Sequence, residues 1–485
     1  MKRKVTRASK RNAQKRYNAI QAKYADPRLA IGDVLFEHFW ARKATTSATS
    51  NDGSERVEDA QCLLQHNDLH KQVPLSAETK LAYNFIASLA QLHMQVAFNL
   101  LVPSYIGHSL EIDLAVQAVI TAISYQTRKC ILNSRKAYHS YGLALQALRQ
   151  TIDFSDSSLM VVALLGQYEG IMRMHTPAQF SHLYGVAKIL LSRAKKSSGP
   201  NELERALLYA DWDRRLRAPV ALGIVSPFED SYWLDAEPMR RFSPAPIVKL
   251  RMLTNKLYIR LPRLVLYVRR LRFGGHGDDV EDLMEKTAKL ANELLALVDQ
   301  EAESFVLHGI KVVKTEDQWD KPIVSYSFRY QTLQQMNFAS WYWHARLILM
   351  QNCLQLMALP RTRRLMLSQS EDELKAETKR MLTNIFMSYQ YAKTLSMMGQ
   401  ICITQPLIVS YGACTYLDRW QELPISSVQK WIVLRINDSW GKWGRSLSSK
   451  DLEEINSVFS GGRLECFLPK VYEEEKLLIE FEDVA

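Results

Sequence analysis

Paired cysteines are absent from this sequence. The six cysteines are scattered along the chain, at Cys62, Cys130, Cys353, Cys402, Cys414 and Cys466, and no two of them form a C-x-x-C pair. A structural zinc site needs thiolates or imidazoles that lie close enough to complete a tetrahedron, so the sequence predicts no such site. Because the chain is long and has no recognisable secretory leader, a disulfide framework is not expected either. We interpret the cysteines as reduced and mostly buried thiols.

Glycine, proline and long apolar runs are also scarce. The chain of 485 residues has 19 glycines and 16 prolines, fewer than a large β-rich protein would need for its turns, so the predicted fold class is all-α. No run of about 18 apolar residues occurs, and we therefore expect no membrane-spanning helix and no membrane partner. The linear motifs of serine hydrolases, zinc proteases and nucleotide-binding enzymes are missing too. We predict no enzymatic activity and no cofactor.

Positive charge is concentrated near the start of the chain. The formal net charge is +11, and nine lysines or arginines lie between Lys2 and Lys23 without any acid. Such basic arms bind nucleic acid or act as nuclear import signals. The candidate residues for DNA contact or nuclear targeting are Lys2, Arg3, Lys4, Arg7, Lys10, Arg11, Lys15 and Arg16. A mitochondrial presequence is the competing interpretation, but the arm is rich in lysine and poor in large apolar side chains.

Composition divides the chain into three parts. Residues 1–43 form the basic arm, residues 44–75 form a polar linker that contains the run ATTSATSNDGSER, and residues 76–485 form a helical domain. The predicted helices cover residues 79–101, 111–127, 134–151, 159–172, 180–193, 246–273 with an interruption at Pro262, 280–303, 325–359, 371–398, 406–420 and 427–443. Asp156 or Ser157 is the predicted N-cap of the fourth helix.

Residues 111–193 contain a recognisable order of helices. An apolar helix is followed by a helix with spaced Tyr, Ala and Leu residues, then by an apolar L-L-x-x-Y-E helix and by a helix with an H-x-x-G-A-like pattern. The matching residues are Ala137, Tyr141, Gly142, Ala144, Leu145, Leu148, Leu164, Leu165, Tyr168, Glu169, His182, Gly185 and Ala187. This stretch resembles the regulatory region of fungal zinc binuclear-cluster transcription factors. The resemblance implies a large, irregular, multi-helix regulatory domain behind the basic arm.

The resemblance also implies a function. We expect a nuclear transcription regulator of fungal type, and the family's habits extend this expectation to control of a specialised metabolic pathway. Its expected partners are DNA through the basic arm and other proteins through the helical domain, a second copy of the chain included. However, the family reads DNA through six cysteines that hold two zinc ions, whereas Cys62, the first cysteine here, has no neighbour. A zinc-less interaction protein that modulates other regulators, or a gene model without its zinc-cluster exon, remains an alternative.

The basic arm is a candidate substitute for the zinc cluster. The run KRNAQKRY, from Lys10 to Tyr17, is similar to the DNA-contacting half of fungal basic-zipper proteins. Lys10 stands at the usual Asn position, however, and no leucine heptad follows. A single basic helix without a dimerising coil binds phosphates weakly and without sequence preference. A nuclear import signal is the simpler interpretation of the same residues.

An aspartate-rich motif offers a second alternative, a helical isoprenoid-processing enzyme. The run DDVED, from Asp278 to Asp282, fits the pattern with which all-helical terpene synthases hold magnesium. It follows FGGHG, so we expect it to open a helix, where the macrodipole stabilises carboxylates without a metal. The second metal motif is incomplete, because Asn437, Asp438 and Ser439 are followed by Gly441 instead of Ser.

Four further features have both a structural and a functional interpretation. The histidines in or near apolar helices, His139, His175, His182 and His344, are predicted to be hydrogen-bonded core residues. The basic stretch of residues 240–272 is predicted to be an amphipathic helix pair with snorkelling cations. The cluster of Trp341, Tyr342 and Trp343 is predicted to belong to the core rather than to a ligand cage. The acidic tail YEEEKLLIEFED, residues 472–483, reads either as an activation segment or as a helix that docks on the basic domain.

Overall fold

The structure of the chain is a computed structural model. It describes residues 76–92, 97–128, 131–151, 153–172, 176–194, 199–210, 213–238, 245–274, 280–362, 366–395, 397–441 and 446–463. The predicted basic arm, the polar linker and the acidic tail lie outside these residues. The described part is mostly helical, with two small two-stranded sheets, which confirms the all-α prediction.

The contacts within the chain define two compact units, Met1–Ile189 and Leu190–Ala485. The division falls inside one helix, α8 (Thr176–Ala194). Sequence patterns placed residues 76–485 in one helical domain and gave no sign of a division at this point. Each unit has its own apolar core, and we describe each by itself.

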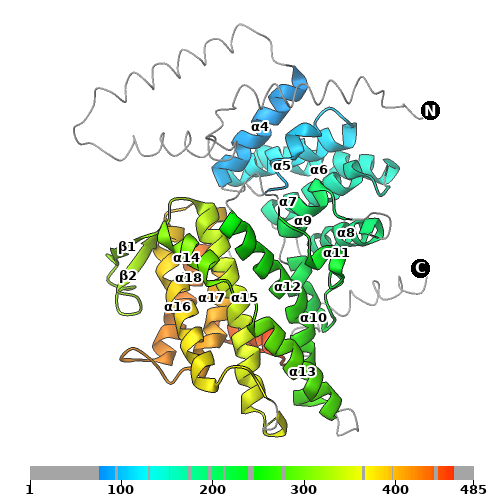
Figure 1. Cartoon of the computed structure of the whole chain (residues 1–485). Coiled ribbons are helices and arrows are strands. Elements are labelled where there is room, and N and C mark those ends of the chain that lie inside the picture. Colours follow the sequence, from blue (N-terminus) through cyan, green and yellow to red (C-terminus); the bar gives the residue numbers. More distant parts are fainter. Residues whose placement is uncertain are drawn as a thin grey trace. The chain divides into compact units, whose positions relative to one another are not determined.

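The first unit is built around one apolar helix. Its described elements are α4 (Ala77–Leu92), the short 3-10 helix η1 (Val102–Ser104), α5 (Leu110–Arg128), α6 (Ile131–Thr151), α7 (Asp156–Met172) and most of α8. Helix α5 packs against α4, α6 and α7, and its residues Val116, Val119 and Ile123 are fully buried (Figure 1). Helix α7 is apolar on nearly all sides, as expected for a helix enclosed by others.

Two details of the first unit differ from the prediction. Helix α4 ends at Leu92 instead of continuing to residue 101, and Pro103 lies in the first turn of η1 instead of stopping a helix. This position suits proline, because the N–H it lacks has no partner in the first turn. The N-cap of α7 is Ser155, one residue before the predicted pair, since its hydroxyl accepts a hydrogen bond from Ser158 N at 3.2 Å.

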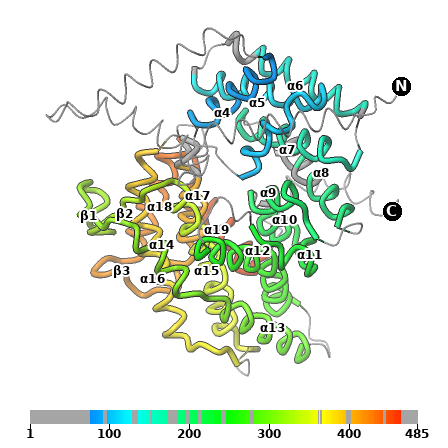
Figure 2. Tube along the Cα trace, turned by 45° about the horizontal axis from the view of Figure 1, so that its top comes forward, coloured from blue at the N-terminus to red at the C-terminus, as the bar shows by residue number. Residues whose placement is uncertain are grey.

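The second unit holds the remaining elements. Its first half consists of α9 (Glu202–Ala210), the π-helical turn η2 (Asp213–Arg217), α10 (Ala218–Leu222), α11 (Ser231–Leu234), α12 (Ala245–Phe273), α13 (Val280–Leu295), α14 (Gln300–His308), β1 (Lys311–Lys314) and β2 (Tyr326–Arg329). Its second half consists of α15 (Leu333–Ala358), η4 (Pro360–Thr362), α16 (Glu371–Lys393), α17 (Met397–Ala413), η5 (Cys414–Tyr416), β3 (Arg419–Trp420), β4 (Leu423–Pro424), α18 (Ile425–Trp440) and α19 (Ser449–Phe459). Helix α15 is buried on nearly all sides, and α12, α16 and α17 pack around it (Figure 2).

Helix α12 is continuous through Pro262, so the predicted interruption and the predicted helix pair are wrong. Proline in a helix interior removes one backbone hydrogen bond and costs about 3 kcal/mol. Burial offsets this cost, because Leu261, Pro262 and Leu264 lie in the core. Near its end, Arg269 donates hydrogen bonds to Val458 O in the last turn of α19 at 3.2 Å and to Gly462 O just after α19 at 2.7 Å. Burial lowers the pKa of Arg269 to about 10, which leaves it charged at neutral pH.

Capping residues explain the breaks that apolar periodicity did not reveal. Residues 280–303 were predicted as one helix, but α14 begins separately after Asp299, whose carboxylate accepts a hydrogen bond from Ala302 N at 2.8 Å. Residues 325–359 were predicted as helix, but they begin with strand β2, and α15 starts after its N-cap Thr332. Pro406 lies inside α17 instead of starting a helix, and α19 was not predicted.

Candidate interaction surface on the β1–β2 hairpin

The eight predicted arm residues, from Lys2 to Arg16, lie outside the described residues. The residues that carry the family resemblance, by contrast, come together in the first unit. Tyr141 of α6 donates a hydrogen bond to the fully buried carboxylate of Glu169 on α7, and His182 Nε2 of α8 lies 3.1 Å from the same oxygen. The ring of Tyr141 stacks on Tyr168 with a centroid distance of 4.5 Å. Burial, together with the bond to Glu169, raises the pKa of Tyr141 above its usual range.

The apolar residues of the same motif are also packed together. Ala137, Ala144, Leu148, Leu164, Leu165 and Ala187 are buried. Gly185 of α8 faces Val162 of α7 so closely that a Cβ would lie 3.2 Å from Val162 Cγ1. The motif residues therefore fix how α6, α7 and α8 pack.

The histidines follow the prediction in part. His344 is fully buried, with Nδ1 2.9 Å from the hydroxyl of Tyr258, and burial lowers its pKa to about 3. His182 is mostly buried beside Glu169, so both residues are confirmed as hydrogen-bonded or paired core residues. His139 is exposed on α6, so the prediction was wrong for it, and His175 lies outside the described residues. Tyr342 and Trp343 are confirmed as buried core residues, whereas Trp341 is only partly buried.

The aspartate-rich motif begins a helix, as expected. Asp282 is an exposed first-turn residue of α13 that pairs with Lys286 at 2.5 Å, while Asp278 lies outside the described residues. At the incomplete second motif, the amide of Asn437 exchanges two hydrogen bonds with the backbone of Leu447. Asp438 pairs with Arg435 at 2.6 Å. Among the described residues, no group of three His, Cys, Asp or Glu side chains could hold a metal ion.

A β-hairpin that the sequence interpretation missed forms the clearest exposed feature of the second unit. Strands β1 and β2 pair antiparallel, with Lys311 opposite Arg329 and Lys314 opposite Tyr326. Strand β2 faces the helices: the Phe328 ring lies 6.3 Å from the Trp343 ring, and just after the strand the Tyr330 hydroxyl lies 2.5 Å from that of Ser388. The hairpin is thus attached to α15 and α16.

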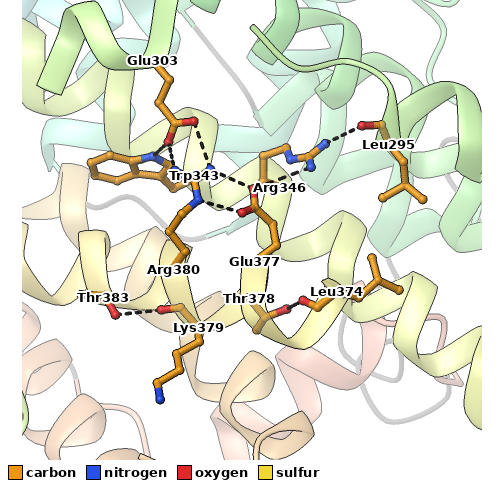
Figure 3. A network of polar contacts seen from close by, with 10 residues as sticks. All are labelled: Leu295, Glu303, Trp343, Arg346, Leu374, Glu377, Thr378, Lys379, Arg380 and Thr383. Carbon is orange, nitrogen blue, oxygen red and sulfur yellow. Dashed lines mark hydrogen bonds and ion pairs between the residues drawn. The ribbon is translucent and has the colours of Figure 1, made fainter. Parts of the chain in front are cut away.

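A network of charged side chains fixes the tryptophan under the hairpin (Figure 3). Trp343 Nε1 donates to Glu303 Oε1 at 2.8 Å, and Arg380 donates to both oxygens of the same carboxylate at 2.7 and 3.1 Å. Arg380 also holds Glu377, and Glu377 lies 3.8 Å from the buried guanidinium of Arg346. The positive charges of two arginines therefore neutralise the negative charges of two glutamates where α14, α15 and α16 meet.

The pKa values reflect this balance. Hydrogen bonding to Glu377 and Glu303 outweighs the cost of burial and raises the pKa of Arg380 above its usual value. Burial opposes ionisation of Glu377, but the bond to Arg380 and the two nearby cations lower its pKa overall. Both groups stay charged at neutral pH.

The segment that joins the two strands, residues 315–325, is also held by buried contacts to α18 and to Trp420. The carboxylate of Asp320 is fully buried, accepts a hydrogen bond from Trp431 Nε1 at 2.7 Å and pairs with Arg435 at 2.7 Å. Trp420 Nε1 donates to Ile323 O at 2.8 Å. The outer residues of this segment are thus held in place by buried polar contacts.

The exposed side chains of the hairpin are apolar residues and cations on both faces of the ribbon, since Val312, Lys314 and Tyr326 share one face and Lys311, Val313 and Arg329 the other. Trp319 is 72% exposed, Val312 58% and Tyr326 50%. The exposed cations are Lys311, Lys314, Lys321 and Arg329, and within the described residues none of them has an ion-pair partner. We call these seven residues, together with Val313, the hairpin surface. Exposed large apolar residues on a firmly held scaffold are typical of protein–protein contact sites, where tryptophan, tyrosine and arginine are enriched.

The signal for this hairpin was present in the sequence. The runs KVVK and YSFR are short and rich in β-branched and aromatic residues, which indicates strands. Both runs lie between longer segments of helical periodicity, and the second was absorbed into the helix predicted at residues 325–359.

Comparison with family models, with curated proteins and with solved structures finds no match to this chain. Within the part of the chain that the structure describes, no helix is both long and apolar enough to cross a membrane.

Proposed function

We propose that this chain is a transcription regulator. Its basic arm directs it to the nucleus and contacts DNA phosphates, and its helical units receive protein partners. The resemblance extends the proposal to control of a specialised metabolic pathway.

One observation supports this proposal most directly. Tyr141, Tyr168, Glu169 and His182 come from three helices and meet in one buried cluster. These are the residues on which the resemblance to fungal regulatory regions depends. Their convergence supports the proposal, because it brings residues of the motif together in one packed unit.

The test is DNA binding by the full chain as a function of salt concentration. Neutralising four arm cations (Lys10→Gln, Arg11→Gln, Lys15→Gln and Arg16→Gln) removes up to four phosphate contacts. The slope of log K against log salt then becomes less steep by up to about 3.6, because each contact contributes about 0.9. The matched control neutralises four exposed lysines elsewhere, Lys136, Lys289, Lys379 and Lys450, for the same change in net charge.

The two outcomes separate clearly. A slope that changes in the arm variant and not in the control supports the arm as the DNA contact. Equal slopes in the two variants contradict it.

A second candidate function is a zinc-less interaction protein that modulates other regulators. The hairpin surface favours it, because an anchored apolar and cationic surface suits a protein partner irrespective of DNA. The same titration distinguishes the two, since this candidate shows no DNA binding at physiological salt in the full chain.

A further inference from the structure

The outer edge of β1 has unused hydrogen-bonding groups. Thr315 N donates to Ser325 O at 3.0 Å, which makes these residues a hydrogen-bonded pair. Bonded and non-bonded pairs alternate in an antiparallel ladder, so Val313 and Lys311 also bond to β2. The N–H and C=O groups of Val312 and Lys314 therefore point away from β2. In Figure 1 and Figure 2, β1 lies on the outer side of β2, away from the helices of its unit.

The charge of this edge disfavours a second copy of the chain as its partner. Two β1 edges brought together would place two sets of four cations close to one another, and nearby like charges are destabilising. The hairpin surface carries four cations without ion-pair partners among the described residues, and Glu316 is the exposed acid beside them. An acidic extended segment fits this edge.

The chain itself contains such a segment. Residues 472–484 read YEEEKLLIEFEDV, with six acids and one lysine. From Ile479 to Glu482 apolar and acidic residues alternate, which is the period of a strand with one apolar face. With Glu482 opposite Lys311, Ile479 and Phe481 would lie on the face of Val312 and Tyr326, and Glu480 and Glu482 would lie on the face of Lys311 and Arg329.

The tether is nearly as long as the unit is wide. The described residues of the second unit end at Arg463, 14 residues before Leu477. An extended tether of that length spans up to about 48 Å, and a compact unit of this size is roughly 50 Å across. A tethered segment also binds at a high effective concentration, which compensates for a short strand.

We propose that residues 472–484 add to the outer edge of β1 as a third strand. The docked tail covers the hairpin surface and is withheld from other proteins. This regulatory consequence rests on the proposed function, in which the tail is a partner-binding segment, whereas the docking itself does not.

The test uses a labelled peptide of residues 472–485 and a chain that ends at Val471. We expect saturable binding to the shortened chain, and binding weaker by at least about tenfold to the full chain, whose own tail competes. Val312→Pro in the shortened chain removes one outward N–H and leaves the ladder to β2 intact, so it weakens binding by at least about tenfold. Val312→Thr, which retains the N–H, is the matched control. Unchanged thermal unfolding of both variants shows that the hairpin is still folded.

Three results overturn the proposal. They are the absence of saturable peptide binding, equal binding of a scrambled peptide of the same composition, and binding that Val312→Pro does not change. Dimerisation of the shortened chain that Val312→Pro abolishes would make a second copy the occupant and would overturn it too. None of these results depends on the arm, so failure here and failure of DNA binding are distinguishable.

Discussion

At the scale of single residues, sequence periodicity predicts whether a side chain is buried, but not which distant residues it contacts. An apolar helical pattern places His344 on α15 and predicts burial, and the prediction is confirmed. The pattern cannot show that Tyr258, 86 positions away, lies against the imidazole. The same holds for Asp320, whose neighbours Trp431 and Arg435 come from α18, so its buried position in a loop has no local signal.

The burial of His344 predicts a pH dependence of stability. Its pKa is about 3 in the folded chain, against the ordinary value of 6.5, so between these values the unfolded state binds the proton and the folded state does not. This contribution to stability is present above pH 6.5 and is lost as pH falls towards 3. Between pH 7 and 5 it removes about 2 kcal/mol of unfolding free energy.

The measurement is urea unfolding of the full chain and of His344→Asn at pH 7 and pH 5. Asparagine keeps a polar atom near the position of Nδ1 but does not titrate in this range. We expect the variant to lose about 2 kcal/mol less than the parent chain between the two pH values. The same loss in both proteins would show that other groups carry the pH dependence.

At the scale of elements, helix existence was easier to predict than helix ends. The predicted helices at residues 111–127 and 134–151 correspond closely to α5 and α6. Amphipathic spacing identifies them well because many residues along one helix face contribute to the pattern. The ends depend on single caps such as Asp299 and Thr332, which also occur in loops that precede no helix. The β1–β2 hairpin was missed because strands of four residues give too few positions for a period of two to stand out.

The glycine that follows α19 is predicted to be important for stability. Gly461 follows the helix with a φ of 73°, and a Cβ there would lie 2.7 Å from Val268 Cγ1 on α12. Gly461→Ala is expected to destabilise the chain by about 2 kcal/mol, because the left-handed backbone and the close approach both oppose a side chain. Gly441→Ala, at a helical backbone position with no atom within 4 Å of the new Cβ, should change stability by less than about 0.5 kcal/mol in the same urea titration.

At the scale of the whole molecule, the sequence predicted a continuous helical domain, and the contacts define two units. No Pro-, Gly- or Ser-rich linker marks the division, since it falls inside α8. A linker would have marked a boundary in the sequence. The compactness of a unit depends instead on contacts between segments far apart in the chain, such as α12 and α15. The DNA-contacting role of Lys2 to Arg16 stays a prediction.

If the two units are energetically separate, a variant in one should leave the other intact. Tyr141→Phe removes a hydrogen-bond donor from the fully buried Glu169 in the first unit, a loss of about 1–3 kcal/mol. Asp320→Asn removes a buried charge that pairs with Arg435 in the second unit, at a cost of about 3 kcal/mol or more. Hydrogen exchange should become faster in α5 and α7 for the first variant and in α16 and α18 for the second. If either variant accelerated exchange in both units equally, the chain would unfold as one cooperative body, and the single domain inferred from the sequence would be the better description.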